Sequence, residues 1–443
     1  MLGLGAGGVV RAEDCAGLRA ELDAGIRAGG ERLTLHHDSA LTPWLRRDRF
    51  PAAELRRAVL RADRTARDVI LDAMAALDAR DLALELGGPE QVPDRVERCR
   101  SEAVAALHSD PGRLRRLARE PVPDAYVGWR RALGLYPLIR PLLRAGAARW
   151  RARERAAIAA GPPAPRLVQG AVRSERPIPR AVARTLAALR ERHPLAWPAP
   201  DPDTLARLGR QFAPELATDA DVPYARIGRL SGRGGRPHVD PADPVALLAP
   251  QLVRWGPHVL LQLEYTFWFT ERPSEGPLDP YGGAVDGLVL RVTLGDDGRA
   301  LVWESIHPCG CYYTIALPAD RPFAYVRPDP ARLEAPLVLA GPPAGARLRV
   351  LHTADTHYLR WARAATAPVP DARHRGYRIE SRSALHAAGP ARPPFDARGI
   401  LRGTARGERA FLWPSGIRSP GAMRTSGRQA TAFLGRRHFD RAE

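Results

Sequence analysis

The sequence predicts an α+β protein, with a helical N-terminal half followed by a mainly antiparallel β-rich C-terminal half. Over residues 12–160, apolar side chains recur three and four positions apart among Ala, Leu and Arg, a pattern typical of helices. After about residue 205, alternating runs rich in Val, Tyr, Phe and Trp are typical of strands. The 443 residues therefore divide into a helical domain 1–160, a linker 161–204 and a β-rich domain 205–443 with a loop-rich tail.

Breaks in the helical half are expected where Gly and Pro gather, near Gly29–Gly30, Pro43, Gly87–Pro89 and Pro121–Pro123. Asp110 followed by Pro111 is typical of a helix start, because Asp caps the first turn and Pro suits its first position. The linker is rich in Pro and Arg, and Pro favours an extended chain. It is expected to hold one short helix, from Pro179 to about Arg192.

Five stretches of the C-terminal half are expected to form strands, the first of them ARIGRLSG at 225–232. The clearest is 286–306, two alternating runs joined by Gly295–Gly298, which predicts a β-hairpin. Alternation in 260–273 puts Glu264 on the face opposite Tyr265, where it is expected to face water. The remaining two strands are expected at 346–353 and 377–383, and the tail after Arg398 is expected to be mostly loop.

The charge balance is strongly basic, with 67 basic against 49 acidic residues and a net charge of +18. Every basic residue is Arg, and the chain has neither Lys nor Asn. Because Lys and Asn have A-rich codons, this bias indicates a G/C-rich genome before it indicates a nucleic-acid partner, which we do not expect. No stretch approaches the roughly 18 apolar residues that a membrane span needs, so no transmembrane segment is expected.

The segment HPCGCYY, residues 307–313, carries the strongest chemical signal. His307, Cys309 and Cys311 alternate, so on an extended chain they project to one face. Thiolate and imidazole are ligands that zinc prefers, and HTADTHY at 352–358 offers a further imidazole at another strand end. The candidate zinc ligands are therefore His307, Cys309, Cys311 and His357, with His352 as an alternative fourth ligand. Asp355 could orient a ligand imidazole.

Three interpretations of this segment stay open. With an open coordination position, zinc would activate a water, and Asp355 or Glu304 would be the base of a metal-dependent hydrolase. Alternatively, Cys309 and Cys311 are buried core residues, as cysteines outside disulfides commonly are. In the third, the two cysteines form a strained disulfide, or one is a nucleophile with His357 as base and Asp355 or Glu304 as its orienting carboxylate.

The C-terminal tail combines Arg with tight turns at Pro414–Gly416 and Pro420–Gly421. Turn amides and guanidinium groups together can bind a phosphate or carboxylate. The alternative is an ordinary solvated surface, on which Arg is common. The candidate ligand-binding residues are Arg424, Arg428, Arg436 and Arg437.

The sequence resembles a family of bacterial proteins of unassigned function. The resemblance rests on motifs spread over most of the chain: YTFWFTERP at 265–273, DGLVLRVTL at 286–294, HPCGCYY at 307–313, THY at 356–358 and GRRHFD at 435–440. It implies no known activity. This chain departs from the family pattern at Tyr313, where a His is expected, and that departure weakens a metal interpretation.

Cys15 and Cys99 lie in the helical half and can pair if the compartment is oxidising. The family resemblance implies an export or lipoprotein signal, which would make the apolar stretch Leu2–Val10 a truncated leader and favour a Cys15–Cys99 bridge. The expected location is then the cell envelope or periplasm, with the cytoplasm as the alternative.

Two functions follow as hypotheses. The first is a protein with a His/Cys zinc centre in the β-rich domain, in one version a metal-dependent hydrolase. The second is a non-catalytic cell-envelope protein that binds a partner or an anionic ligand and whose cysteines are structural.

Overall fold

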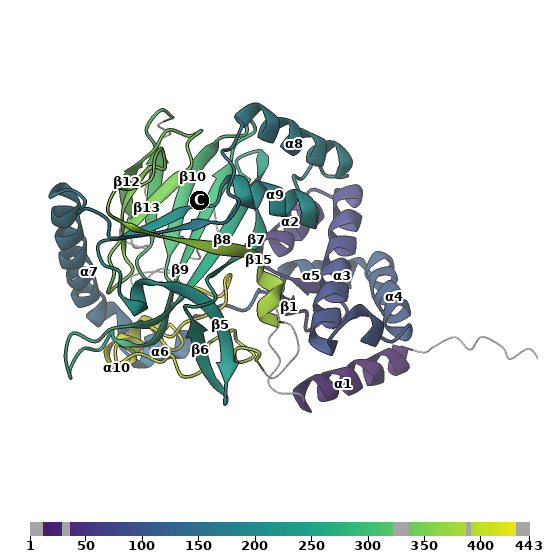
Figure 1. Ribbon diagram of the computed structural model, residues 1–443. Coiled ribbons are helices and arrows are strands. Elements are labelled where there is room, and N and C mark those ends of the chain that lie inside the picture. The colour runs from purple at the N-terminus through teal and green to yellow at the C-terminus, as the bar shows by residue number, and fades with distance from the viewer. Residues whose placement is uncertain (1–11, 29–35, 322–335, 387–390, 431–443) are drawn as a thin grey trace, which may run out of the picture. The chain divides into compact units, whose positions relative to one another are not determined.

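The computed structural model describes residues 12–28, 36–321, 336–386 and 391–430 (Figure 1). It has helices first and strands afterwards, which confirms the α+β order expected from the sequence. The chain forms two compact units, residues 1–123 with 386–389, and residues 124–385 with 390–443. These boundaries differ from the expected breaks at 160 and 204, because the helices after residue 124 belong to the second unit.

The first unit is mainly helical, with a two-stranded antiparallel ribbon. The carboxylates of Asp48, Asp63 and Asp110 each accept a hydrogen bond from a first-turn backbone N–H. At α5, Asp110 and Pro111 begin the helix as the sequence predicted. Its elements are α1 (Ala12–Ala28), β1 (His37–Asp38), β2 (Arg46–Arg47), α2 (Arg49–Leu60), α3 (Arg64–Leu86), η1 (Pro89–Gln91), α4 (Arg95–Ser109) and α5 (Pro111–Arg119).

A disulfide between Cys15 and Cys99 joins α1 to α4. Both cysteines are buried in a small apolar core that also contains Leu82 and Val96. The bridge closes a loop across a sequence separation of 84. Cross-linking such distant residues restricts the unfolded chain, so the bridge stabilises this unit.

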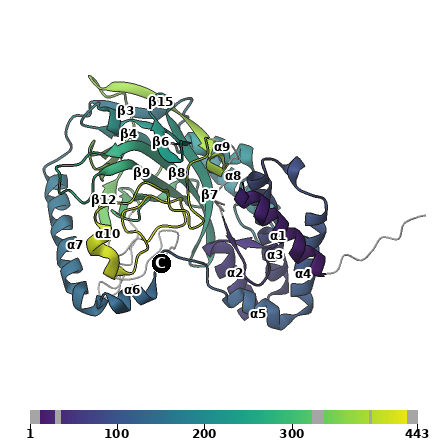
Figure 2. The same cartoon turned by 90° about the horizontal axis from the view of Figure 1, so that it is seen from below.

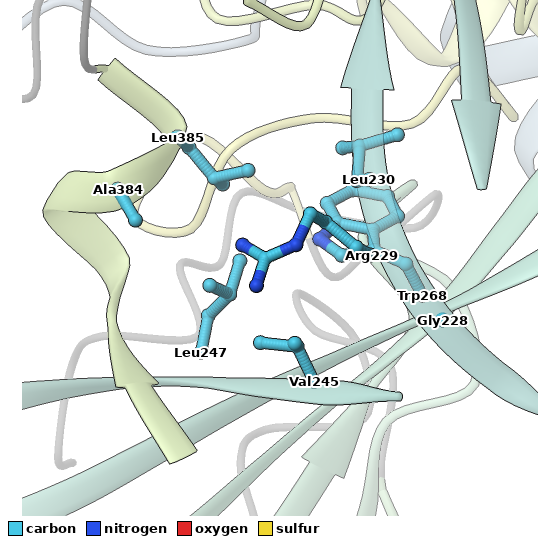
Figure 3. Close-up of a pocket in the computed structure, with 8 residues that line it drawn as sticks. All are labelled: Gly228, Arg229, Leu230, Val245, Leu247, Trp268, Ala384 and Leu385. Carbon is cyan, nitrogen blue, oxygen red and sulfur yellow. The ribbon is translucent and has the colours of Figure 1, made fainter. Parts of the chain in front are cut away.

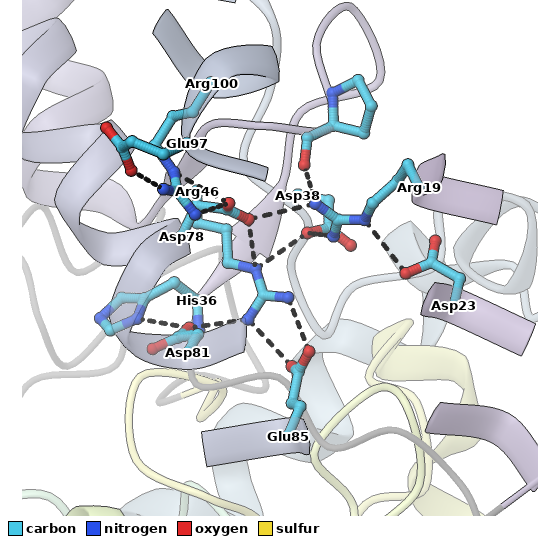
Figure 4. Close-up of polar contacts among 11 residues, drawn as sticks. Arg19, Asp23, His36, Asp38, Arg46, Asp78, Asp81, Glu85, Glu97 and Arg100 are labelled. Atoms are coloured by element: carbon cyan, nitrogen blue, oxygen red, sulfur yellow. Dashed lines mark hydrogen bonds and ion pairs between the residues drawn. The ribbon is translucent and has the colours of Figure 1, made fainter. Parts of the chain in front are cut away.

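Buried ion pairs fill the space between the helices of the first unit (Figure 4). The Arg46 guanidinium is 0 % exposed and donates two hydrogen bonds to the Glu85 carboxylate, at 2.9 and 2.7 Å. Asp78 accepts from both Arg19 and Arg100. Burial would raise the pKa of Asp81, but His36 and Arg46 hold that pKa well below its usual value. Each carboxylate therefore depends on a cationic neighbour for its charged form.

The second unit holds a large sheet with helices around it. The helix α8 has the range expected from the sequence. Its helices are α6 (Gly128–Leu133), α7 (Tyr136–Ala159), α8 (Pro179–Arg192), α9 (Pro202–Gln211), η2 (Pro223–Ala225), η3 (Arg382–His386), α10 (Arg409–Leu412) and η4 (Trp413–Ser415). Its strands are β3 (Leu167–Ala171), β4 (Glu215–Thr218), β5 (Ile227–Arg233), β6 (Arg236–Asp240), β7 (Val245–Trp255), β8 (His258–Arg272), β9 (Gly283–Leu294), β10 (Ala300–Ile306), β11 (Thr314–Pro318), β12 (Leu337–Gly341), β13 (Leu348–His352), β14 (Leu359–Ala364) and β15 (Arg373–Ser381).

The sheet is mixed and barrel-like, so the expectation of a mainly antiparallel sheet was wrong. Its main path runs β12-β11-β10-β9-β8-β7-β15-β3-β4-β13-β14, and β5 and β6 branch from β8. The pairs β11–β12, β13–β4, β15–β3 and β15–β7 are parallel. Alternation reports which face of a strand is buried, not the direction of its neighbour, so the sequence could not reveal these pairings. The two edge strands, β12 and β14, lie against each other and nearly close the sheet.

The interior of the barrel is a continuous apolar core. Its lining alternates along the strands, as in Leu263, Tyr265, Phe267 and Phe269 of β8. Helices α8 and α9 pack on this core at the end that carries the β9–β10 turn (Figure 1). There Gly298 has φ +73°, and a Cβ at this position would lie 2.1 Å from the carbonyl oxygen of Pro179. Only glycine fits this approach of the turn to the helix.

Glu264 does not face water, contrary to the expectation. It is 1 % exposed, and its carboxylate accepts hydrogen bonds from Arg291 at 2.7 Å and Arg382 at 2.6 Å. Burial alone would raise its pKa, but the two guanidinium groups hold the pKa below its usual value. Alternation placed Glu264 on the correct face, but that face is covered.

The first prediction concerns the disulfide. Because Cys309 and Cys311 are buried, protein denatured without reductant should show two titratable thiols, and protein denatured with reductant should show four. Replacing Cys15 and Cys99 together with Ser should lower the free energy of unfolding by about 2–4 kcal/mol, since the long loop is no longer closed. Urea unfolding measures this, and four titratable thiols in the denatured but unreduced protein would contradict the bridge.

The second prediction concerns acid. A carboxyl whose pKa is lower folded than unfolded contributes stability above its unfolded pKa and loses it as pH falls. In urea, the amides of helix α3 should therefore lose protection from hydrogen exchange as pH drops below about 4, where the Asp side chains of the unfolded chain begin to take up protons. Asp81→Asn should cost about 3 kcal/mol at pH 7 and flatten this pH dependence, because one buried charged partner is gone. Pulsed hydrogen exchange on α3 peptides, at one fixed pulse pH, is the measurement. An unchanged acid response in Asp81→Asn would contradict it.

Candidate functional site

At the end of the barrel away from α8, three strands end in polar side chains that face inward. Asp286 lies two residues before Leu288 of the core, and His352 lies two residues after Val350. His307 follows β10 directly and shares the inward face of Trp303. All three polar side chains are at most 3 % exposed. The apolar interior therefore ends in a polar layer, which we call the barrel mouth.

Asp286 is the centre of this layer. Its Oδ2 lies 2.8 Å from Nδ1 of His357, and its Oδ1 lies 3.6 Å from Nδ1 of His307. Burial would raise the pKa of Asp286, but the two imidazoles hold it well below its usual value. The carboxylate thus stays charged and is held between two rings from distant segments.

His357 is fixed on every side. Its Nε2 lies 2.9 Å from the carbonyl oxygen of Tyr224, and its ring stacks on Phe269 with centroids 3.9 Å apart. The Nε2 of His307 faces the carbonyl oxygen of His357 at 3.3 Å. Both nitrogens of His357 therefore face oxygen acceptors, so neither offers a lone pair to a metal ion in this arrangement.

His352 has the opposite arrangement. Its Nδ1 donates to the carbonyl oxygen of Thr353 at 2.9 Å, which fixes the tautomer and leaves the lone pair on Nε2. That Nε2 is buried and has no hydrogen-bond partner among the described residues. Burial, with a smaller effect of His357, lowers the pKa of His352 to about 3, so the ring stays neutral. It presents a buried acceptor at the barrel mouth.

Backbone strain gathers at the same place. Three residues here have positive φ without being glycine: Val285 (+54°), Tyr312 (+62°) and His357 (+55°). The left-handed region is especially unfavourable for a β-branched residue such as Val285. His357 binds Asp286 of the layer, Val285 directly precedes Asp286, and the Tyr312 ring lies 5.0 Å from that of His307. Such strain persists where surrounding structure enforces it, and it is concentrated at functional sites.

An arginine and several aromatic rings lie at the outer side of the mouth. The Arg272 guanidinium lies over the rings of Tyr281, Tyr312 and Tyr358, between 5.4 and 5.8 Å from their centroids. Burial would lower the pKa of Arg272, but the neighbouring tyrosines raise it above its usual value. Arg272 and Tyr312 are partly exposed, so this side of the site reaches solvent. Trp150 of α7 packs against Tyr312 and Tyr358.

Glu408, from the C-terminal segment, lies close enough to Arg272, Arg406 and Asp286 for their charges to act on its carboxyl. It is 5 % exposed, and burial raises its pKa to about 7, although Arg272 and Arg406 act in the opposite direction. Arg406 holds this segment in place by donating to the carbonyl oxygen of Val285 at 2.6 Å. A carboxyl whose pKa lies near neutrality can both take and give a proton at working pH.

The structure brings together some of the predicted site residues. His307 and His357 meet through Asp286, as described. Cys309 and Cys311 are both buried, each 6 % exposed, in the turn after β10. Gly310 between them has φ +95°, and a Cβ there would lie 2.1 Å from the carbonyl oxygen of Ala430. The turn is therefore pressed against the C-terminal segment.

The two predicted catalytic carboxylates lie elsewhere. Asp355 is exposed in the β13–β14 connection and accepts from the backbone N–H of Thr356. Glu304 of β10 accepts from the hydroxyl of Tyr313 and from Gln262, away from the Asp286 layer. Among the described residues, neither carboxylate pairs with His307 or His357. The carboxyls at the barrel mouth are Asp286 and Glu408.

The predicted arginines are buried where the structure describes them. Arg424 is 2 % exposed and donates to the carbonyl oxygens of Arg418 and Ser419. Burial lowers its pKa, while the nearby Cys309 and Cys311 act to raise it. Arg428 is 8 % exposed. Both side chains are therefore largely covered, Arg436 and Arg437 lie outside the described residues, and the anion site stays a prediction.

Within the described ranges, no group of three or more His, Cys, Asp or Glu side chains is arranged to hold a metal ion. The predicted zinc set would require His357 to leave Asp286 and Tyr224. The zinc centre stays a prediction.

Sequence reasoning missed Asp286, Arg272, Tyr312, Tyr358 and Glu408. The first four fall inside the motifs at 265–273, 286–294, 307–313 and 356–358, so a search for polar residues shared among those motifs could have found them. Glu408 carries no such signal.

A small cavity lies between β5, β7 and η3. This cavity, shown in Figure 3, is lined mainly by apolar side chains, among them Leu230 and Leu247, with Trp268 beside them. Its volume is about 20 Å³, which is room for a single water. The indole N–H of Trp268 is buried with no partner among the described residues, so such a water would have a donor to accept from.

Comparison with known protein families, with curated proteins and with solved structures gives no match for this chain.

The third prediction follows from Glu408. The pKa of Glu408 is about 7 in the folded protein and 4.5 in the unfolded chain. Such a carboxyl lowers the free energy of unfolding as pH rises between these two values. At about 1.4 kcal/mol per pH unit, that difference amounts to about 3 kcal/mol. Glu408→Gln should therefore be more stable than the parent protein at pH 8 and should lose this slope. Urea unfolding between pH 5 and 8 measures it, and parallel stability curves for the two proteins would contradict the raised pKa.

Proposed function

We propose that the barrel mouth is the active site of an enzyme that performs acid–base chemistry, of the hydrolytic class, on an anionic substrate. The observation that carries the proposal is the strained, buried layer of Asp286, His307 and His357 at the inner end of a partly exposed Arg272. Strained residues cluster at active sites, and three of them lie at this layer.

Each group has a role in this proposal. Arg272 binds the negative group of the substrate, since a guanidinium pairs with carboxylate or phosphate through two parallel hydrogen bonds. Glu408 takes the proton of the attacking water and returns it to the leaving group. Asp286 is a positioning residue that holds His307 below Tyr312. The unpaired Nε2 of His352 accepts a hydrogen bond from a substrate or water that enters the mouth.

The Cys15–Cys99 disulfide supports an oxidising location. We propose that the protein works in the cell envelope or periplasm.

The fourth prediction tests the catalytic role. The parent protein should hydrolyse at least one member of a panel of anionic p-nitrophenyl phosphates, sulfates, glycosiduronates and carboxylated esters. Glu408→Gln should lower kcat about a hundredfold or more, because a general acid–base contributes that much. Arg272→Gln should raise KM for the same substrate. Glu380→Gln, which removes a carboxylate paired with Arg229 elsewhere in the unit, should behave as the parent does.

Equal turnover in Glu408→Gln and the parent would refute the catalytic role. A second outcome separates the non-catalytic alternative from the enzyme. If no panel member is hydrolysed but inorganic phosphate or citrate binds by calorimetry and Arg272→Gln abolishes that binding, the mouth is an anion-binding site without chemistry.

The zinc version has its own measurement. Elemental analysis that finds about one zinc per chain, lost in both Cys309→Ser and His357→Ala, would establish the predicted ligand set and move the chemistry to a metal-bound water. Metal retained in both variants would exclude that ligand set.

A further inference from the structure

Helix α6 and the start of α7 expose an unusual amount of apolar surface. Trp129, Leu133, Leu135, Leu138 and Leu142 are 61 %, 69 %, 59 %, 72 % and 73 % exposed. Within the described residues, twelve large hydrophobic side chains are exposed, and these five fall within one stretch of the chain. Scattered exposed Leu residues need no explanation, but a contiguous group indicates an interaction surface.

The stretch lies at one edge of the second unit. Figure 2 shows α6 at the foot of α7, with α10 beside it. Leu138 and Leu142 are one turn apart and share a face of α7. The other end of the helix is fixed to the sheet, because the buried Glu154 pairs with Arg360 of β14 at 2.8 Å. The exposed leucines therefore lie on a helix whose other end is anchored to the sheet.

A neighbouring segment extends the apolar surface. Trp413 and Phe411, from η4 and α10, are 38 % and 46 % exposed. η4 packs directly on α6, where the Arg131 side chain donates to the carbonyl oxygen of Ser415 at 2.6 Å. The apolar surface thus comprises Trp129, Leu133, Leu135, Leu138, Leu142, Phe411 and Trp413, and we call it the α6–α7 patch.

The stretch of chain that carries the five α6–α7 residues of the patch has charges of one sign only. Between Asp124 and Glu154 the chain has no acidic residue and seven arginines: Arg130, Arg131, Arg140, Arg144, Arg149, Arg151 and Arg153. The whole chain has 67 basic and 49 acidic residues. A genomic preference for Arg over Lys therefore does not explain why this stretch has no Asp or Glu. A protein partner would commonly place acidic groups or a matched pocket here, whereas leucine and tryptophan beside arginine match an acyl chain below a negative headgroup.

We propose that the α6–α7 patch binds the surface of an anionic phospholipid bilayer, with its leucines and tryptophans in the interface and its arginines at the headgroups. No helix among the described residues is long and apolar enough to cross a membrane. The geometry corresponds to a helix that lies on the bilayer. Since Trp150 of the same helix contacts Tyr312, the bound orientation also fixes the barrel mouth relative to the membrane. The proposal does not depend on the proposed enzymatic activity.

Co-sedimentation of the full chain with vesicles tests it. The protein should bind phosphatidylcholine vesicles that contain phosphatidylglycerol, bind pure phosphatidylcholine vesicles much more weakly, and lose affinity as salt rises. The double variant Leu138→Glu/Leu142→Glu should bind the anionic vesicles about a hundredfold more weakly, because two side chains no longer enter the interface. Both residues are exposed, so circular dichroism should show an unchanged fold.

The matched control is Ile178→Glu/Leu278→Glu, which changes the net charge equally at two positions that are 63 % and 94 % exposed outside the patch. It should bind as the parent does. Equal weakening by both double variants would reduce the effect to net charge and overturn the proposal. So would absence of vesicle binding together with a self-associated parent protein that Leu138→Glu/Leu142→Glu makes monomeric in light scattering, since the patch would then join two copies of the chain.

Discussion

The second unit depends on one buried carboxylate. Asp286 receives the imidazoles of His307 and His357, and through His357 it also fixes the segment that contains Tyr224. Three strand ends and one loop therefore meet at a single negative charge. A charge so deeply buried is tolerated only when partners surround it. Removing either imidazole would leave the negative charge of Asp286 buried without enough positive or hydrogen-bonding partners. Arg272 and Tyr312 are positioned above this layer, so their spacing follows from it.

The parts of the fold that could be predicted are those in which the partners are close along the chain. The hairpin at 286–306 appears as β9 and β10 because its alternation and its turn residues lie in one stretch. β3 was hidden in the expected linker, since five residues among prolines carry little periodic signal and its partners, β4 and β15, lie far along the sequence. Similarly, alternation placed Glu264 on its face, but only the fold shows that Arg291 and Arg382 cover it.

The candidate site divides in the same way. His307 and His357 were expected to meet because both follow strands, and the structure brings them together. Asp286, which joins them, was not foreseen. In the sequence, a carboxylate at an inward position of a strand only interrupts the alternation of apolar residues and does not indicate a site. The exclusive use of Arg also has a structural role. Buried carboxylates in both units, Glu85 and Glu264 among them, are held by guanidinium groups, whose forked geometry suits a carboxylate better than an ammonium does.

The order of strands in the large sheet has a consequence for how the chain assembles. β3 is made early, yet it pairs on one side with β15, which is among the last strands in the sequence. One edge of β7 pairs with β8, and its other edge stays unpaired until β15 has been synthesised. Such pairings are formed between distant segments and are intrinsically slow. While the chain is still being synthesised, β7, β8 and β9 can pair with one another but have an unfilled edge. During that interval the unpaired strand edges of the second unit can associate with other chains. The first unit can already fold, because all of it except residues 386–389 has been synthesised by residue 123.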